Sequence, residues 1–205
     1  MAILDHADRV RISQAIRAAE ANTAGEIYVV IARAADDYRF VPILWAALVA
    51  LLAPWPLHVL TDLSAGTILL VQAATFVWIA VAASHPAIRY RIVPSAIAAE
   101  AARKAAEGLF VAHGVHQTEA RTGILIYVAL AERRVEIVAD AGINAKVEQA
   151  AWDELAGEIV AAARAKALVD GIIAAVRRAG SLLAAHFPHR PDDRNELADR
   201  VVEIE

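Results

Sequence analysis

The sequence predicts an α/β fold in which a small mixed sheet of three to four strands is flanked by helices and interrupted by a two-helix transmembrane hairpin. Short apolar runs rich in β-branched residues alternate with longer helical segments, as in an α/β domain. Two long uncharged runs also follow one another between residues 40 and 86, and each has the length of a membrane span. The predicted order is helix, strand, hairpin, helix, strand, strand, helix, helix.

The chain opens with a predicted helix from Asp5 to Ala21, for which Asp5 is a suitable N-cap. A break at residues 23–25 ends it. The next segment, Ile27 to Ala32, is a short apolar run that is bounded by a charged residue and glycine on one side and by Arg33 on the other. Such a run is typical of a central strand that is covered on both faces.

The predicted hairpin consists of two runs without charged side chains, Phe40 to Leu57 and Leu63 to Ser84. A bilayer core of ~30 Å needs ~20 apolar residues in a helix. Trp45, Trp55 and Trp78 fall within the runs, and tryptophan favours the membrane–water interface. The alternative is a buried hairpin in a soluble core, but a chain of 205 residues has no core that could bury two helices apolar on every side.

The basic residues predict an orientation. Arg33 and Arg39 precede the hairpin, Arg89 and Arg91 follow it, and the turn between the two runs contains neither lysine nor arginine. By the positive-inside rule, the turn is extracytoplasmic, and the soluble domain and both termini are cytoplasmic.

Two prolines complicate the first run. Proline removes a helical hydrogen bond, so Pro54 and Pro56 either kink the helix or end it near Ala53. A kinked helix crosses the bilayer, whereas a helix that ends there makes the hairpin re-entrant. The sequence favours the kinked crossing.

The second half of the chain supplies the rest of the α/β domain. A β-hairpin is expected where two apolar runs flank a short charged turn. The predicted elements are a helix from Ser95 to Ala112, strands Gly123–Ala131 and Val135–Ala139, a helix capped by Asn144 and continuing to Lys166, and a helix from Leu168 to His186. A strand, a crossover helix and a second strand pair in parallel, so the first two strands should be parallel and the third antiparallel to the second.

These elements define three regions. Residues 1–39 and 88–187 form a discontinuous α/β domain, residues 40–86 form the transmembrane hairpin, and residues 188–205 form a flexible charged tail.

Composition and motifs exclude several classes of function. The chain has no cysteine, so it has neither disulfides nor thiolate chemistry, and its net charge of −4 does not favour nucleic acid. No phosphate loop or nucleophile elbow occurs. His113 and His116 have a spacing that could hold zinc, but Gly114 interrupts them, which favours a role in helix capping. We expect no catalytic residues, no cofactor and no metal.

One group of polar residues is a candidate binding site. In an antiparallel β-hairpin the start of one strand and the end of the next are neighbours, so Arg121 and Asp140 should meet at one rim of the sheet. The alternatives are a structural ion pair, which is favoured, and a polar pocket for an anion or peptide. The candidate rim consists of Glu26, His116, Thr118, Arg121, Thr122 and Asp140.

The predicted β-hairpin resembles that of the TPM domain family, whose pattern is a glycine followed by apolar residues, an arginine with a following isoleucine, and a closing glycine. The matching residues are Gly123, Ile124, Leu125, Arg134, Ile137 and Gly142. The resemblance covers about residues 5–33 and 94–187 and is to the bacterial predicted-membrane-protein branch, which implies a location in the bacterial inner membrane.

The resemblance also implies a phosphatase activity as an alternative function. Some plant members are described as acid phosphatases that bind calcium near an acidic residue before the glycine of the second strand. Arg121 and Thr122 stand at that place here, and the expected Gly-x-Gly reads Asp140-Ala141-Gly142. The sequence therefore favours a non-enzymatic interaction or regulatory module at the cytoplasmic membrane face, with a divergent hydrolase or phosphatase as the alternative. The expected partners are the lipid bilayer and either another protein or a second copy joined through the hairpin.

Overall fold

The computed structural model describes residues 3–118, 120–189 and 200–204. The chain divides into two compact units. The first contains the residues up to Ala35 and those from Ala99 onward, and the second contains Asp36–Ala98.

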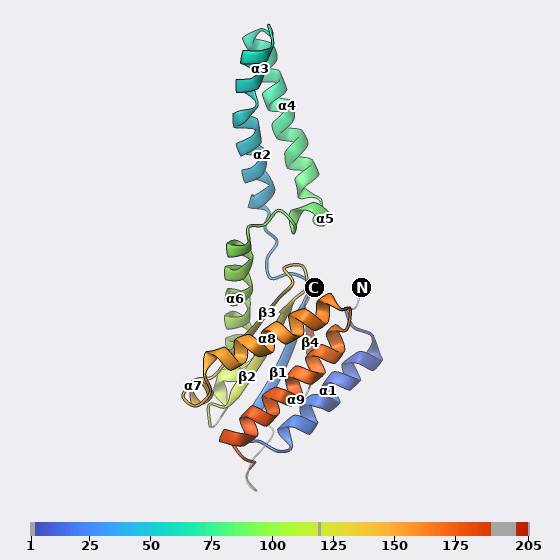
Figure 1. Ribbon diagram of the computed structural model, residues 1–205, viewed down its shortest axis with the longest axis vertical. Helices are drawn as coiled ribbons and strands as arrows, with labels where there is room; N and C mark the ends of the chain where they lie inside the picture. The colour runs from blue at the N-terminus through green and yellow to red at the C-terminus, as the bar shows by residue number, and fades with distance from the viewer. Residues whose placement is uncertain (1–2, 119, 190–199, 205) are drawn as a thin grey trace. The chain divides into compact units, whose positions relative to one another are not determined.

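The first unit is built on a four-stranded mixed sheet (Figure 1). Its strands are β1 (Glu26–Ala32), β2 (Gly123–Ala129), β3 (Arg134–Ala139) and β4 (Val201–Ile204), in the order β3-β2-β1-β4. β1 is parallel to both β2 and β4, and β2 is antiparallel to β3. The predicted fold class is therefore confirmed, including the parallel central pair and the antiparallel hairpin.

One face of the sheet is covered by three helices, α1 (His6–Glu20), α8 (Gln149–Arg164) and α9 (Leu168–His186) (Figure 1). Alternate residues of β1 and β2 point to this side because side chains along a strand alternate between faces. The core on this face includes Ile27 of β1 and Trp152 of α8, both almost completely buried.

The other face packs against α6 (Ser95–Ala112). The intervening residues of the same strands, such as Tyr28, join Ala102 and Phe110 of the helix in a second core. Every residue of β1 and β2 is buried, because both faces of these strands are covered. This explains why, after Glu26, their sequences are continuous apolar runs without polar alternation.

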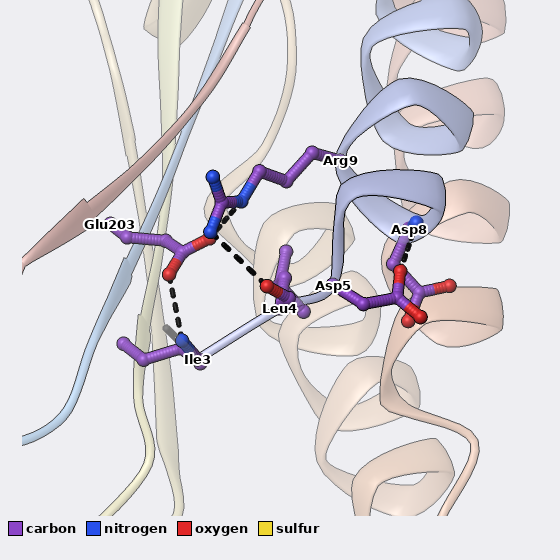
Figure 2. A network of polar contacts seen from close by, with 6 residues as sticks. All are labelled: Ile3, Leu4, Asp5, Asp8, Arg9 and Glu203. Carbon is purple, nitrogen blue, oxygen red and sulfur yellow. Dashed lines mark hydrogen bonds and ion pairs between the residues drawn. The ribbon is translucent and has the colours of Figure 1, made fainter. Parts of the chain in front are cut away.

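β4 corrects the prediction of a flexible tail, because Val201–Ile204 extend the sheet beside β1. Figure 2 shows how Glu203 ties this strand to the region of α1. Its two carboxylate oxygens accept hydrogen bonds from the Arg9 side chain at 2.6 Å and from the Ile3 backbone N–H at 2.8 Å. Arg9 also donates to the carbonyl of Leu4 at 3.2 Å. Residues 190–199 and 205 of the predicted tail lie outside the described residues.

The helix predicted from Asn144 to Lys166 is shorter in the structure: α8 begins at Gln149, with Glu148 as its N-cap, and ends at Arg164. A short helix, α7 (Ala141–Asn144), precedes α8, and its N-cap is Asp140. Asn144 is not a cap, since its side-chain amide donates to the carbonyl of Ala139 at 2.8 Å. The prediction was wrong here because Asn144 ends α7, with its side chain bound to the end of β3, and residues 145–148 separate the two helices.

The second unit is a helical hairpin. Its first arm comprises α2 (Phe40–Leu52) and α3 (Pro54–Leu60), and its second arm is α4 (Ala65–Ser84), followed by the short α5 (Pro86–Arg89). α4 is capped by Ser64, whose hydroxyl accepts from the Thr67 N–H.

The two prolines do not end the first arm. Ala53, between α2 and α3, has helical angles of φ −57° and ψ −38°, and the helix runs on from Phe40 to Leu60 over 21 residues. At 1.5 Å per residue this arm is about 31 Å long. Pro54 stands at the first turn of α3, where a missing N–H is tolerated.

Both arms are long and apolar enough to span a membrane. They bury little of their apolar surface within the protein, since 4 of 21 residues are buried in the first arm and 2 of 20 in the second. Trp55, Leu60, Leu70 and Trp78 are each at least 70% exposed. A core helix of a soluble protein would be mostly buried, so these helices differ from that class.

Candidate functional site

The candidate rim lies at the end of the sheet where β1 and β2 begin and β3 ends. Glu26, the first residue of β1, pairs with Gly123 of β2, and its N–H donates to the carbonyl of Thr122 at 3.1 Å. Asp140 follows β3, and its N–H donates to the carbonyl of Gly123 at 2.9 Å. The parallel register of β1 with β2 and the antiparallel register of β2 with β3 therefore bring Glu26, Thr122 and Asp140 to one end of the sheet.

Two threonines hold the loop that enters β2. The Thr118 hydroxyl accepts a hydrogen bond from the Thr122 N–H at 2.9 Å, and the Thr122 hydroxyl donates to the carbonyl of Ala24 at 2.7 Å. Both side chains are buried. These hydrogen bonds use the hydroxyl groups to connect the loop to the start of β1, which is a structural role.

Arg121 and Asp140 meet as the sequence predicted. The Nη1 atom of Arg121 lies 3.9 Å from Oδ1 of Asp140, with the Arg121 side chain 60% exposed and that of Asp140 6% exposed. The same Oδ1 accepts from the Ala141 N–H at 2.6 Å and so caps α7. Oδ2 is buried and has no hydrogen-bond partner among the described residues. The rim thus carries a buried carboxylate beside a solvent-exposed guanidinium.

His116 stands apart from this group. It belongs to the short 3-10 helix η1 (Val115–Gln117), and its ring lies 6.3 Å from that of Phe110 on α6. Within the described part of the chain it shares no hydrogen bond with the other five rim residues. His113 contacts Tyr28 instead, with 3.2 Å between Nδ1 and the phenol oxygen. The two histidines therefore have separate neighbours, although their spacing in sequence suggested a common site.

Two glycines shape the rim, and sequence reasoning treated them only as pattern matches. A Cβ on Gly123 would lie 2.2 Å from the carbonyl oxygen of Val115, and one on Gly142 would lie 2.5 Å from that of Arg121. Backbone segments thus approach each other here more closely than any side chain permits. Arg121 itself adopts a left-handed conformation, with φ 53°. A glycine on each side of a polar loop is the signal that could have located this close packing.

The chemistry that the described residues of the rim can perform is limited. No group of three or more histidine, aspartate or glutamate side chains in the described ranges is arranged to hold a metal ion. The buried groups are mainly engaged with backbone atoms, which leaves the Arg121 guanidinium, beside the buried Asp140, as the charged group of the rim that meets solvent.

Comparison with known families shows to which family this chain belongs. A sequence profile of the TPM domain matches residues 80–182. The chain belongs to the TPM domain family. The match covers α6, β2, β3, α7 and α8 and most of α9, so both Gly123 and Gly142 lie within it. The recognition made from the sequence is confirmed.

One solved structure shares the TPM fold of this chain. The BA42 protein from the psychrophilic bacterium Bizionia argentinensis, determined by NMR, superposes with a TM-score of 0.62 at 21% sequence identity. The alignment covers 98% of this chain and 96% of BA42. At this identity the likeness concerns the fold alone. No match was found among curated proteins.

Proposed function

We propose that this TPM-domain protein is anchored in the cell membrane by its helical hairpin, and that its α/β unit is a non-enzymatic interaction module at the cytoplasmic face. The observation that carries the proposal is the exposed apolar surface of the hairpin. Large side chains such as Leu60 and Trp78 are 79% and 71% exposed. An apolar surface of this extent in water is very unfavourable, and a bilayer removes that cost.

Contacts between the two ends of the hairpin support a chain that crosses the membrane twice. The indole N–H of Trp45 on the first arm donates to the carbonyl of Ile92, beyond the second arm, at 3.1 Å. The rings of Tyr38 and Tyr90 meet edge to face with centroids 6.1 Å apart. Both ends of the hairpin are therefore joined at one level, and these aromatic side chains suit the membrane interface.

The rim supports an interaction role over catalysis. Asp140 serves as the N-cap of α7 and lies beside the exposed guanidinium of Arg121. Such an arrangement can recognise an acidic group on a partner, since arginine pairs well with carboxylates. We propose that Arg121, supported by Asp140, Glu26 and the two threonines, contributes to a protein-binding surface, with His116 at its margin.

Single cysteines test the anchoring and its orientation. The chain has no cysteine of its own, so Asp62→Cys in the hairpin turn and Ala161→Cys on the exposed side of α8 are clean reporters. We expect an impermeant thiol reagent to label Asp62→Cys in intact cells and Ala161→Cys only after permeabilisation. Alkaline carbonate should leave both variants in the membrane pellet. Release by carbonate would overturn the anchoring, and the reverse labelling pattern would overturn the orientation.

A phosphatase assay on the full chain, purified in detergent, tests the proposal that the protein is not an enzyme. We expect no phosphatase turnover with or without a divalent cation. Turnover that is lost in Asp140→Ala would replace the interaction role by a hydrolase role and leave the anchoring untouched.

The hairpin also offers a basis for self-association. Gln72 of α4 lines a hollow of about 420 Å³ together with small residues of both arms, Ala47, Ala50 and Ala73. Within the described ranges its amide has no hydrogen-bond partner. An amide in hydrocarbon gains from pairing, and an identical amide on a second copy offers both a donor and an acceptor. We propose a homodimer with Gln72 at its centre.

Replacing Gln72 tests this pairing. Gln72→Leu should weaken dimerisation in lipid nanodiscs about threefold to tenfold, corresponding to one intramembrane hydrogen bond. Thr75→Val is the matched control, because it also removes a polar group from α4 but lies outside the hollow. Equal dimer fractions in the wild type and Gln72→Leu would contradict the proposal. The fractions can be counted by single-molecule photobleaching.

A further inference from the structure

A basic pocket lies at the end of the sheet opposite the rim. It has a volume of about 350 Å³ and is formed by the end of β2, the start of β3, and the ends of α8 and α9 that face them. Apolar side chains that include Leu130, Val160 and Leu168 line it, together with three arginines, Arg133, Arg134 and Arg164. No acidic residue belongs to its lining.

Two of the arginines, Arg133 and Arg164, are available to a ligand. Arg133 occupies the turn between β2 and β3 in a left-handed conformation, with φ 55°. Arg133 and Arg164 are exposed, and neither has an ion pair among the described residues. The nearby carboxylate of Glu132 is directed elsewhere, since it accepts from the Ala35 N–H at 2.9 Å. A pocket with three positive charges and apolar walls is complementary to an amphiphilic anion.

The chain itself limits how far this pocket can be from the hairpin. Ala129, which lines the pocket, pairs with Ala32, the last residue of β1. The first helical residue of the hairpin, Phe40, follows Ala32 by eight positions. Eight extended residues reach at most about 28 Å. Whatever the orientation of the two units, the end of the sheet that carries the pocket stays within that distance of the start of the first arm.

We propose that this pocket binds the phosphate headgroup of an anionic phospholipid, with the glycerol and upper acyl region of the lipid against its apolar walls. The inference rests on the proposed membrane anchoring. Guanidinium groups bind phosphate oxygens through paired, charge-assisted hydrogen bonds. The cytoplasmic leaflet is rich in anionic lipids, so the ligand is abundant on the side where the soluble unit is proposed to lie. Binding orients the α/β unit on the membrane surface.

Native mass spectrometry of the full chain in detergent tests the pocket. The probe is an equimolar mixture of phosphatidylglycerol and phosphatidylcholine with identical acyl chains. We expect the wild type to retain phosphatidylglycerol in preference to phosphatidylcholine. The double variant Arg133→Gln with Arg164→Gln should lower that preference about tenfold or more, because it removes two charged donors.

A second double variant controls for charge. Arg103→Gln with Lys104→Gln removes the same two charges from α6, outside the pocket, and should keep the wild-type preference. An equal loss in both double variants would show nonspecific attraction and overturn the inference. Displacement of the lipid by millimolar inorganic phosphate would overturn it too, because the apolar walls would then contribute nothing.

The two proposals fail separately. A chain that carbonate releases from the membrane refutes the anchoring. A chain that stays in the membrane but shows no preference for phosphatidylglycerol refutes the lipid pocket alone. Thermal unfolding of both double variants, measured by circular dichroism, checks that each remains folded and that the comparison concerns binding.

Discussion

Replacing Gly123 with alanine should lower the free energy of unfolding of the α/β unit by about 3 kcal/mol or more. The added Cβ would lie 2.2 Å from the carbonyl oxygen of Val115 and 2.7 Å from its Cγ1. Neither group can move easily, because Val115 is completely buried and Gly123 is the first residue of a central strand. The pairing of Glu26 with Gly123 would be disturbed at the same point. Chemical denaturation followed by circular dichroism measures the loss.

A second glycine provides the control. A Cβ on Gly157, in the middle of α8, meets nothing within 4 Å. Gly157→Ala should therefore stabilise the protein by about 0.5 to 1 kcal/mol, since alanine is the better helix former. Equal stability of Gly123→Ala and Gly157→Ala would mean that the close approach of Val115 to β2 is wrong.

Removing the carboxylate of Glu203 should cost about 2 kcal/mol at neutral pH. Glu203→Ala leaves the N–H of Ile3 and the guanidinium of Arg9 without their shared acceptor (Figure 2). It also releases β4 from the segment before α1. The control is Glu158→Ala, which breaks an exposed ion pair with Arg178 and should cost less than about 0.5 kcal/mol. A loss no larger than that of the control would contradict the role assigned to Glu203.

The effect of Glu203 should depend on pH. Burial acts to raise the pKa of Glu203, but the hydrogen bonds from Ile3 and Arg9 outweigh it, and the pKa lies below its ordinary value. A carboxyl group with a lowered pKa in the folded state stabilises the protein above the pKa of the unfolded chain, near 4.3. This contribution is lost as the pH falls through the lowered pKa. The stability difference between the wild type and Glu203→Ala should therefore be constant from about pH 5 to 7 and shrink in more acidic solution.

Much of the α/β architecture could be predicted because the decisive signals are local. β1 and β2 read as unbroken apolar runs, and the crossover rule then gave their parallel pairing. β4 could not be found in this way. Its four residues, Val201–Ile204, include Glu203 and follow a charged stretch, so nothing local marks them as a strand. They form a strand because they pair with the free edge of β1, and strand propensity depends strongly on such tertiary context.

The candidate site, too, could be predicted from the sequence only in part. Arg121 and Asp140 could be brought together from the β-hairpin register, because pairing two strands fixes which ends are neighbours. The position of His116 could not, since it depends on how η1 packs against Phe110. The basic pocket was missed for a similar reason. Arg164 comes from α8, 31 positions after Arg133 of the β-hairpin turn, and only packing of the helix on the sheet brings them together.

The insertion of the hairpin between β1 and its crossover helix has a consequence for synthesis of the protein. Glu26 pairs with Gly123, which is made 97 residues later (123 − 26). At about 5 to 20 residues per second, translation of that interval takes roughly 5 to 20 seconds. During this time β1, seven residues that are all buried in the finished sheet, has no partner strand. We therefore expect the nascent chain to depend on a chaperone over this interval, with the hairpin completed before the sheet can close.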